Sequence, residues 1–191
     1  MKITFDTDEE VLPGYARVSS ILKPLANFAG VDEDVLEAAK IRGQEVHKAL
    51  EMDSMDIFYP VPAECRGYID SAKRWMKLTQ YQVLQSEVRL YDHSLKITGK
   101  PDAFVCVGNG PLFLVDWKNT ASQNREYWEH QGMFYHHLAA KNGVNLSKKM
   151  MFVQLCPEGS MPRVYSFQAT EILWRECLKY YNAYCSKNPV F

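Results

Sequence analysis

The chain has 191 residues, 47% of them hydrophobic, which is enough to bury the core of a single domain. The formal net charge of −1 excludes nucleic-acid binding through bulk positive charge, so any such binding needs a local basic patch. No apolar run approaches the roughly 20 residues of a membrane span, and the acidic start is neither a signal nor a transit peptide.

Helical spacing dominates residues 1–81. We expect helices over residues 18–30, 32–52 and 63–80. Ser19 or Ser20 is expected to cap the first, which ends near Gly30. The second has acidic residues in its first turn and apolar positions that repeat with helical spacing, namely Val35, Leu36, Ala39, Val46, Ala49 and Leu50.

From residue 82 the hydrophobic period changes to two, which predicts strands. We expect strands over residues 82–92 and 94–100, a hairpin of 102–107 and 112–118 around a GNGP turn, a helix over 124–143, strands over 149–155 and 163–169, and a terminal helix capped by Thr170. This order predicts an α/β fold of the α+β kind, in which a mixed sheet is flanked by helices.

The hairpin carries charges where a half-buried strand favours apolar residues. Asp102 begins its first strand and Asp116 lies near the end of the second, so antiparallel pairing brings the two carboxylates together. A divalent cation such as Mg²⁺ would relieve their repulsion. Lys118 points to the same strand face as Asp116, and the carbonyl of Trp117 remains free as a ligand. The alternative is that these residues form the solvent side of an ordinary hairpin.

Several short motifs, in and around this hairpin, occur along the chain in the order found in a known superfamily of proteins. Pro101-Asp102 and Asp116-Trp117-Lys118 resemble the core of the PD-(D/E)xK nuclease superfamily. IRGQEVHKALE, Gly67-Tyr68-Ile69, the acidic strand at Glu87 and HQGMFYHHL resemble its RecB-like branch. Within that branch the order is similar to that of the mitochondrial genome maintenance exonuclease and its phage and bacterial relatives. The resemblance covers roughly residues 17–185.

The resemblance implies a restriction-endonuclease-like core and a set of site residues. One or two Mg²⁺ or Mn²⁺ ions would be held by His47, Asp102, Asp116 and the Trp117 carbonyl. The implied catalytic residues are Asp102, Asp116, Lys118, Gln131, Tyr135 and Glu87. Glu87 is open to three interpretations: a ligand of a metal-bound water, a partner of a basic side chain, or a plain strand residue. Gln131 and Tyr135 would hold phosphate oxygens or order Lys118; the alternative is a solvent-facing helix with one core tyrosine.

Basic and aromatic residues mixed on the helix over 63–80 suit single-stranded nucleic acid, although a solvated face with core aromatics is the alternative. The candidate nucleic-acid contacts are Arg42, Arg66, Lys73, Arg74, Lys77 and Trp75. The five cysteines are scattered, without a C-x-x-C pair, which is typical of reduced thiols in a cytoplasmic protein. The family's iron–sulfur members carry a tight cysteine trio that is missing here, so no iron–sulfur cluster is expected.

The sequence is therefore interpreted as one nuclease domain, with an arch-like helical region over 1–81 and a catalytic core over 82–191. The expected activity is metal-dependent hydrolysis of DNA phosphodiesters, by an exonuclease acting on single-stranded ends in recombination, repair or replication. The expected setting is the cytoplasm of a bacterial or phage-infected cell, with a single-strand-binding or recombination protein as a possible partner of a monomer or small homo-oligomer. The alternatives are a ring-forming exonuclease that digests duplex ends and an inactive nucleic-acid-binding module.

Overall fold

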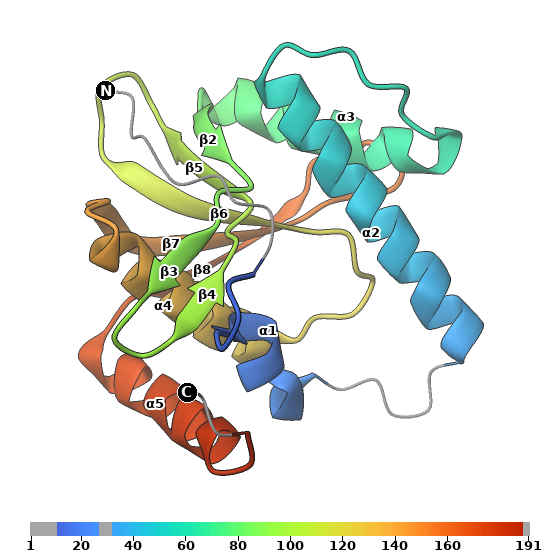
Figure 1. Ribbon diagram of the computed structural model, residues 1–191. Helices are drawn as coiled ribbons and strands as arrows, with labels where there is room; N and C mark the ends of the chain where they lie inside the picture. The colour runs from blue at the N-terminus through green and yellow to red at the C-terminus, as the bar shows by residue number, and fades with distance from the viewer. Residues whose placement is uncertain (1–10, 27–31, 189–191) are drawn as a thin grey trace.

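The computed structural model describes residues 11–26 and 32–188 (Figure 1). With η for a 3-10 helix, the elements are β1 (Ala16–Arg17), α1 (Val18–Ile21), η1 (Lys23–Leu25), α2 (Glu33–Ser54), η2 (Ala63–Cys65), α3 (Arg66–Thr79), β2 (Gln82–Ser86), β3 (Leu90–Asp92), β4 (Ile97–Gly99), β5 (Ala103–Cys106), β6 (Leu112–Lys118), α4 (Arg125–Lys141), β7 (Leu146–Gln154), β8 (Arg163–Gln168) and α5 (Glu171–Cys185).

A five-stranded mixed sheet forms the centre of the molecule, in the order β2-β5-β6-β7-β8. Its neighbours pair antiparallel except β6 and β7, which are parallel and are joined through α4. That crossover is the usual connection between parallel strands, because a tight turn cannot join them. A second sheet, β1-β4-β3, has three short strands. The predicted mixed sheet and the GNGP hairpin of β5 and β6 are confirmed.

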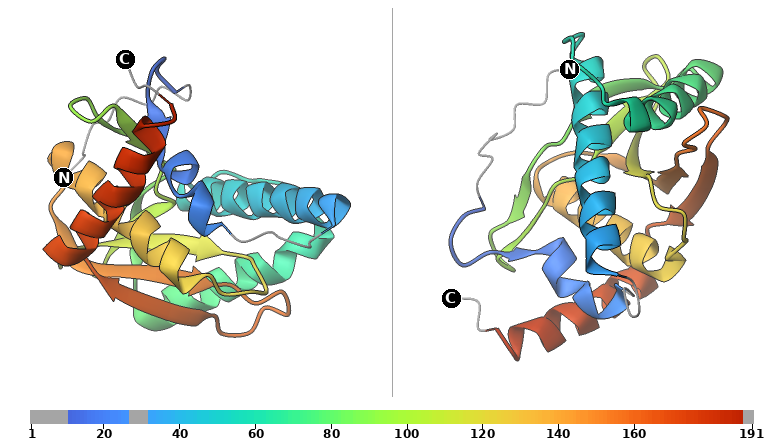
Figure 2. Two further views of the ribbon diagram at one scale, coloured as in Figure 1. Left: turned by 90° about the horizontal axis from the view of Figure 1, so that it is seen from below. Right: turned by 90° about the vertical axis from the view of Figure 1, so that its right-hand side faces the viewer.

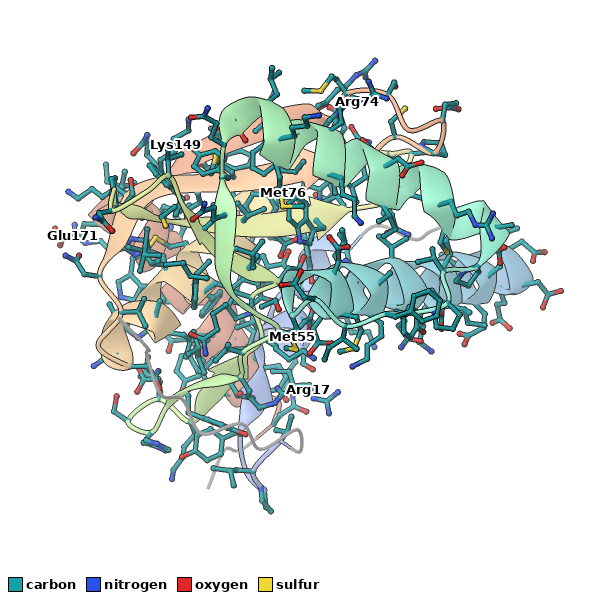
Figure 3. The ribbon with its side chains drawn as sticks, turned by 90° about the horizontal axis from the view of Figure 1, so that it is seen from above. Arg17, Met55, Arg74, Met76, Lys149 and Glu171 are labelled. Carbon is teal, nitrogen blue, oxygen red and sulfur yellow. The ribbon has the colours of Figure 1, made fainter. Side chains whose placement is uncertain are left out.

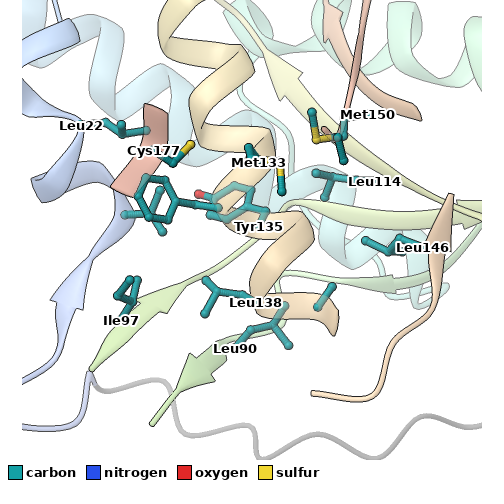
Figure 4. Packing of buried hydrophobic residues seen from close by; sticks show 14 of the residues in the cluster. Leu22, Leu90, Ile97, Leu114, Met133, Tyr135, Leu138, Leu146, Met150 and Cys177 are labelled. Atoms are coloured by element: carbon teal, nitrogen blue, oxygen red, sulfur yellow. The ribbon is translucent and has the colours of Figure 1, made fainter. Parts of the chain in front are cut away.

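Helices cover both faces of the larger sheet, with α2 and α3 on one side and α4 and α5 on the other (Figures 1 and 2). On the second side, Leu114 and Met150 from the sheet pack with Met133 and Leu138 of α4 and Cys177 of α5 (Figure 4). On the first side, a separate cluster joins α2 and α3 to the odd-numbered residues of β5, β6 and β7. The central strands are thus buried on both faces, and charged side chains reach water only at their ends.

The N-terminal region differs from the sequence prediction. The first helix runs only over α1 before a 3-10 turn, no side chain caps it, and its expected end near Gly30 lies outside the described residues. Residues 16–17, to which the sequence analysis assigned no element, form β1 beside β4. Of the apolar positions expected inside α2, Val35 is 59% exposed, because the N-terminal half of this helix extends beyond the sheet (Figure 1).

The strand expected over residues 82–92 is in fact two strands in different sheets. Glu87 separates them with a φ of 54°, in the left-handed region. A non-glycine residue pays a steric penalty there, so this conformation marks a break enforced by its surroundings. The alternating pattern of residues 82–92 continues through this break, which is why periodicity did not reveal it.

No helix within the described ranges combines the length and the apolar character that a bilayer crossing requires.

Candidate metal centre and its groove

The end of the β5–β6 hairpin brings two buried carboxylates together. Ala103 pairs with Val115, so the same register places Asp102 across from Asp116. Both residues are buried, at 7% and 1% exposure. One oxygen of Asp102 accepts a hydrogen bond from the backbone N–H of Trp117 at 2.6 Å, which fixes that carboxylate against β6. Antiparallel pairing therefore delivers the juxtaposition that the sequence pattern predicts.

His47 approaches this pair from α2. Val46, Ala49 and Leu50 anchor that part of the helix in the core. The Nδ1 atom of His47 lies 3.2 Å from an oxygen of Asp102, while Nε2 lies 3.2 Å from the carbonyl oxygen of Trp117. Burial alone would lower the pKa of His47, but the neighbouring carboxylates outweigh burial and raise this pKa well above its usual value.

Glu87 completes a cluster of three candidate metal ligands. Its backbone N–H donates to the carbonyl of Asp102 at 3.0 Å, and its carboxylate lies 3.4 Å from Nδ1 of His47 and 2.7 Å from Nζ of Lys100. Ligand atoms of His47, Glu87 and Asp102 all lie within 4.8 Å of one another. Two carboxylates and an imidazole are a donor set that suits Mg²⁺ or Mn²⁺.

Lys118 lies on the α4 side of the site, where its ammonium group forms an ion pair with Asp116. It also donates to Oε1 of Gln131 at 2.9 Å, and the Gln131 amide in turn donates to the hydroxyl of Tyr135 at 3.1 Å. Burial and the charge of Asp102 raise the pKa of Asp116 to about 7. Burial would lower the pKa of Lys118, but the charges of Asp116 and Asp102 raise it overall. Of the two predicted roles of Gln131 and Tyr135, this geometry matches the ordering of Lys118.

The candidate ligand set differs from the one expected from the sequence. Glu87 belongs to the three-residue cluster, whereas Asp116 does not and instead forms an ion pair with Lys118 on the same strand. The Trp117 carbonyl, expected to be free, accepts a hydrogen bond from His47. These contacts arise because α2 and α4 approach the same strand end from opposite faces of the sheet. The sequence pattern contains no information on that approach.

A groove with a volume of about 1610 Å³ runs past the cluster. One wall is a face of α2 and the other is the edge strand β2 with the chain that follows it. The loop after β6 closes the floor through Asn119 and Thr120. His47, Glu87 and Asp102 all line the groove, so a chain-like substrate lying in it would reach the candidate metal ligands.

The nucleic-acid contacts predicted on α3 do not line this groove. Arg66, Lys73, Arg74 and Lys77 are exposed, but Lys73 forms an ion pair with Asp53 and Arg74 donates to the carbonyl of Gly159 on the β7–β8 connection. Figure 3 places Arg74 well away from Met55, which borders the groove. Arg42 is half-buried on α2 and is likewise not part of the lining.

Trp75 is a correction to the predicted set. It is only 4% exposed, and its ring packs edge-on against Trp117 with 5.7 Å between ring centroids. A side chain with this burial has no face on which a base could stack. The aromatic and basic residues of α3 alternate with helical spacing, so the aromatics form the core side while the cations remain in solvent.

Two cationic residues that line the groove, Lys100 and Arg89, were not among the site residues predicted from the sequence. Lys100 directly precedes Pro101-Asp102 and forms the ion pair with Glu87. Arg89 follows the break at Glu87 and lines the groove. The position of Lys100 beside the motif was a usable signal, whereas Arg89 carried none, because the strand break that places it is not visible in the pattern.

Comparisons with known proteins agree with this architecture at the level of the fold. Neither models of protein families nor curated proteins match the sequence. Among solved structures, a "putative exonuclease" from Eubacterium rectale has a TM-score of 0.56 at 14% identity, over 96% of this chain and 85% of that one. The protein SSO0001 has a TM-score of 0.51 at 11% identity, over 95% and 79%. An alkaline exonuclease from Laribacter hongkongensis is similar at a TM-score of 0.46 and 12% identity, over 91% and 87%.

The first two similarities, with TM-scores above 0.5, define a class of fold. The chain has a mixed α/β architecture, and this arrangement of the chain is similar to that of the protein named "putative exonuclease". At such low identity the similarity extends to the arrangement of the chain and not to its chemistry. What the protein does therefore has to be argued from the residues at the end of the hairpin.

Proposed function

We propose that the protein is a metal-dependent DNA nuclease of the PD-(D/E)xK superfamily and of its RecB-like branch. The reaction is hydrolysis of phosphodiester bonds, and the favoured mode is exonuclease action on single-stranded ends in recombination, repair or replication. The observation that carries the proposal is the cluster of His47, Glu87 and Asp102 within 4.8 Å, which lines the groove. The buried ion pair of Asp116 and Lys118 lies beside this cluster.

The residues fit a divalent cation. Asp102 and Asp116 are both buried, and the proximity of Asp102 helps to raise the pKa of Asp116 to about 7, so the metal-free site holds unfavourable negative charge. His47, Glu87 and Asp102 would hold Mg²⁺ or Mn²⁺, with Asp116 and the Trp117 carbonyl as further oxygen donors at the same strand end. When bound, the cation supplies Lewis acidity and lowers the pKa of water.

The protein's own side chains contribute positioning and charge. The ammonium group of Lys118 donates a hydrogen bond to Gln131, and Gln131 in turn donates one to Tyr135. These hydrogen bonds hold the ammonium group of Lys118 in one position. In this position the ammonium group of Lys118 orients an attacking water molecule and offsets the negative charge that develops on the phosphate oxygens. The surrounding apolar core limits competing solvent, since Asp116 is 1% exposed.

The fold gives further support. The protein named "putative exonuclease" has a similar arrangement of its chain over 85% of its length. In this proposal an extended strand lies in the groove beside the candidate ligands, and α2, which forms one of its walls, is the arch-like part of a single domain. DNA is accordingly the proposed partner, with a single-strand-binding or recombination protein as an associate.

The proposal is tested with end-labelled linear single strands, linear duplexes and single-stranded circles, each incubated with Mg²⁺, Mn²⁺ or EDTA. We expect stepwise shortening of linear single strands, lost in EDTA. Cleavage of single-stranded circles would be consistent with the proposed metal centre, but it would show that the enzyme does not require strand ends. Digestion of duplex ends that depends on oligomer formation would indicate the ring-forming alternative. No cleavage by folded protein would overturn the nuclease assignment.

A further inference from the structure

The wall of the groove formed by β2 contains a β-bulge. Val83 pairs with Val105 and Gln85 with Phe104, so Leu84 is an extra residue without a partner on β5. A bulge re-aims the side chain of the extra residue. Leu84 lines the groove and is 56% exposed, and Met55 at the end of α2 lines it too and is 50% exposed. Two large, exposed apolar side chains thus border a groove that also contains many charged groups.

The cations that line the same groove are not equivalent. Lys40 and Lys48 form ion pairs with Glu37 and Glu51 of α2, and Lys100 forms one with Glu87. Within residues 11–26 and 32–188, the guanidinium group of Arg89 has no hydrogen bond or ion pair, and its Nε atom is buried. A buried donor without a partner is costly, so its position needs an explanation beyond folding.

From these observations we infer that Arg89 is a substrate-positioning residue: it binds a backbone phosphate of a single-stranded nucleic acid, while Leu84 and Met55 contact an adjacent nucleobase. This inference rests on the proposed nuclease function and deepens it. Arginine matches the geometry of phosphate oxygens with its forked donors. Apolar contact to bases and cationic contact to phosphates is the combination by which proteins hold single strands without reading sequence.

The charge along the groove gives the strand a preferred location. The wall at the start of α2 contains Glu33, Asp34 and Glu37, which would repel phosphates. Arg89 and Lys100 lie on the opposite wall, which also contains Glu87 of the metal cluster. The strand is therefore held along the β2 wall and not along α3, where the sequence pattern had placed the basic contacts.

The test measures binding separately from cleavage. Fluorescence anisotropy of a labelled single-stranded oligonucleotide, in EDTA and over a range of salt concentrations, is compared for wild type, Arg89→Gln, Arg89→Lys and Leu84→Ala. Arg163→Gln is the matched control, because Arg163 is exposed on β8, at the other edge of the sheet. Cleavage kinetics with Mg²⁺ give KM and kcat for the same variants, and circular dichroism checks their folding.

We expect Arg89→Gln to weaken binding about tenfold and to lower the slope of log K against log salt by about 0.7, as for the loss of one phosphate contact. KM should rise while kcat changes little, and Arg89→Lys should restore the slope. Leu84→Ala should weaken binding with the slope unchanged, since an apolar contact releases no counterions.

Two results would overturn the inference alone: an active wild type with unchanged binding and salt slope in Arg89→Gln, or an equal loss in Arg163→Gln. A folded wild type that neither binds nor cleaves single strands would overturn the proposed function and this inference together. Because binding is measured in EDTA, these two failures are distinguishable.

Discussion

Asp102 and Asp116 face each other across the open end of the β5–β6 hairpin, where both are shielded from water. The carboxylates repel each other, which contributes to the pKa of about 7 for Asp116. Lys118 and His47 are the cationic or potentially cationic partners on either side of this pair. The two carboxylates and their two basic partners thus lie together at one strand end. The contribution of each side chain can be tested by replacing that residue alone.

Replacing Lys118 by methionine keeps the length of the side chain and removes its charge. Because Lys118 is the cation held beside Asp116 and Gln131, we expect cleavage to fall by about 10²- to 10³-fold, as for the loss of one preorganised group that stabilises the transition state. Binding of single strands in EDTA should change much less. The measurement is a single-turnover cleavage rate with Mg²⁺.

Lys179→Met is the matched control for this prediction, because Lys179 is exposed on α5, away from the site. Its rate should equal that of wild type. A Lys118→Met protein that is folded and cleaves at the wild-type rate would remove Lys118 from the chemistry while leaving the fold assignment intact.

Divalent metal ions should stabilise the folded protein. A ligand that binds only the native state adds about 2.7 kcal/mol to the free energy of unfolding at 100 times its dissociation constant. We expect the unfolding midpoint of EDTA-treated wild type to rise with added Mn²⁺. Glu87→Gln, which removes one carboxylate of the cluster, should reduce this rise strongly. Glu64→Gln, at an exposed position of η2, should retain it. Equal responses of the two variants would exclude Glu87 from the metal centre.

The sequence predicted those parts of the site that depend on local order along the chain. Asp102 and Asp116 meet because a short turn joins their strands, and Gln131 and Tyr135 lie four residues apart on one helix, so both relationships follow from spacing. His47 was identified only through its motif, because the contact between α2 and the hairpin joins residues 55 positions or more apart.

The remaining features depend on the tertiary structure. The left-handed backbone at Glu87 splits an apparently continuous strand, and this break directs Glu87 to the metal cluster and Arg89 to the groove. Trp75 and the cations of α3 have the composition of a binding face, yet the helix turns its aromatic side into the core. Residue composition and hydrophobic periodicity alone do not determine which element packs against which face of a helix or strand.

Two glycines of the recognised motifs should respond oppositely to alanine. A Cβ atom at Gly67 would lie 1.6 Å from the carbonyl oxygen of Pro157, so α3 and the β7–β8 connection would have to separate. At Gly43 the nearest atom is an Asn119 side-chain oxygen at 3.4 Å, which leaves room. We expect Gly67→Ala to lower the free energy of unfolding by about 2–4 kcal/mol.

Gly43→Ala should instead leave stability unchanged or raise it by about 0.5–1 kcal/mol, because glycine is unfavourable inside a helix. Urea denaturation of both variants in EDTA checks the pair without involving metal binding. Similar losses in both would show that the close approach of α3 to Pro157 does not constrain the fold.

The last prediction concerns acid stability at the β3–β4 turn. Asp92 is 2% exposed; it accepts hydrogen bonds from the backbone and hydroxyl of Ser94 and from the backbone of Leu95, and its other oxygen lies 2.7 Å from Nε2 of His137. Burial alone would raise the pKa of Asp92, but these hydrogen bonds outweigh burial and lower its pKa to about 2. Since the ordinary value is about 3.9, the charged form is favoured in the native state.

A lowered carboxyl pKa stabilises the protein above the ordinary value, and this contribution disappears as the pH falls through the folded-state pKa. We therefore expect wild type to lose about 2 kcal/mol of unfolding free energy from this group between about pH 4 and pH 2. Asp92→Asn should lack that part of the loss, while Asp56→Asn, at an exposed left-handed position that asparagine tolerates, should follow wild type. Urea titrations at successive pH values give the three curves. Parallel curves for wild type and Asp92→Asn would mean that the hydrogen bonds to Asp92 do not favour its charged form.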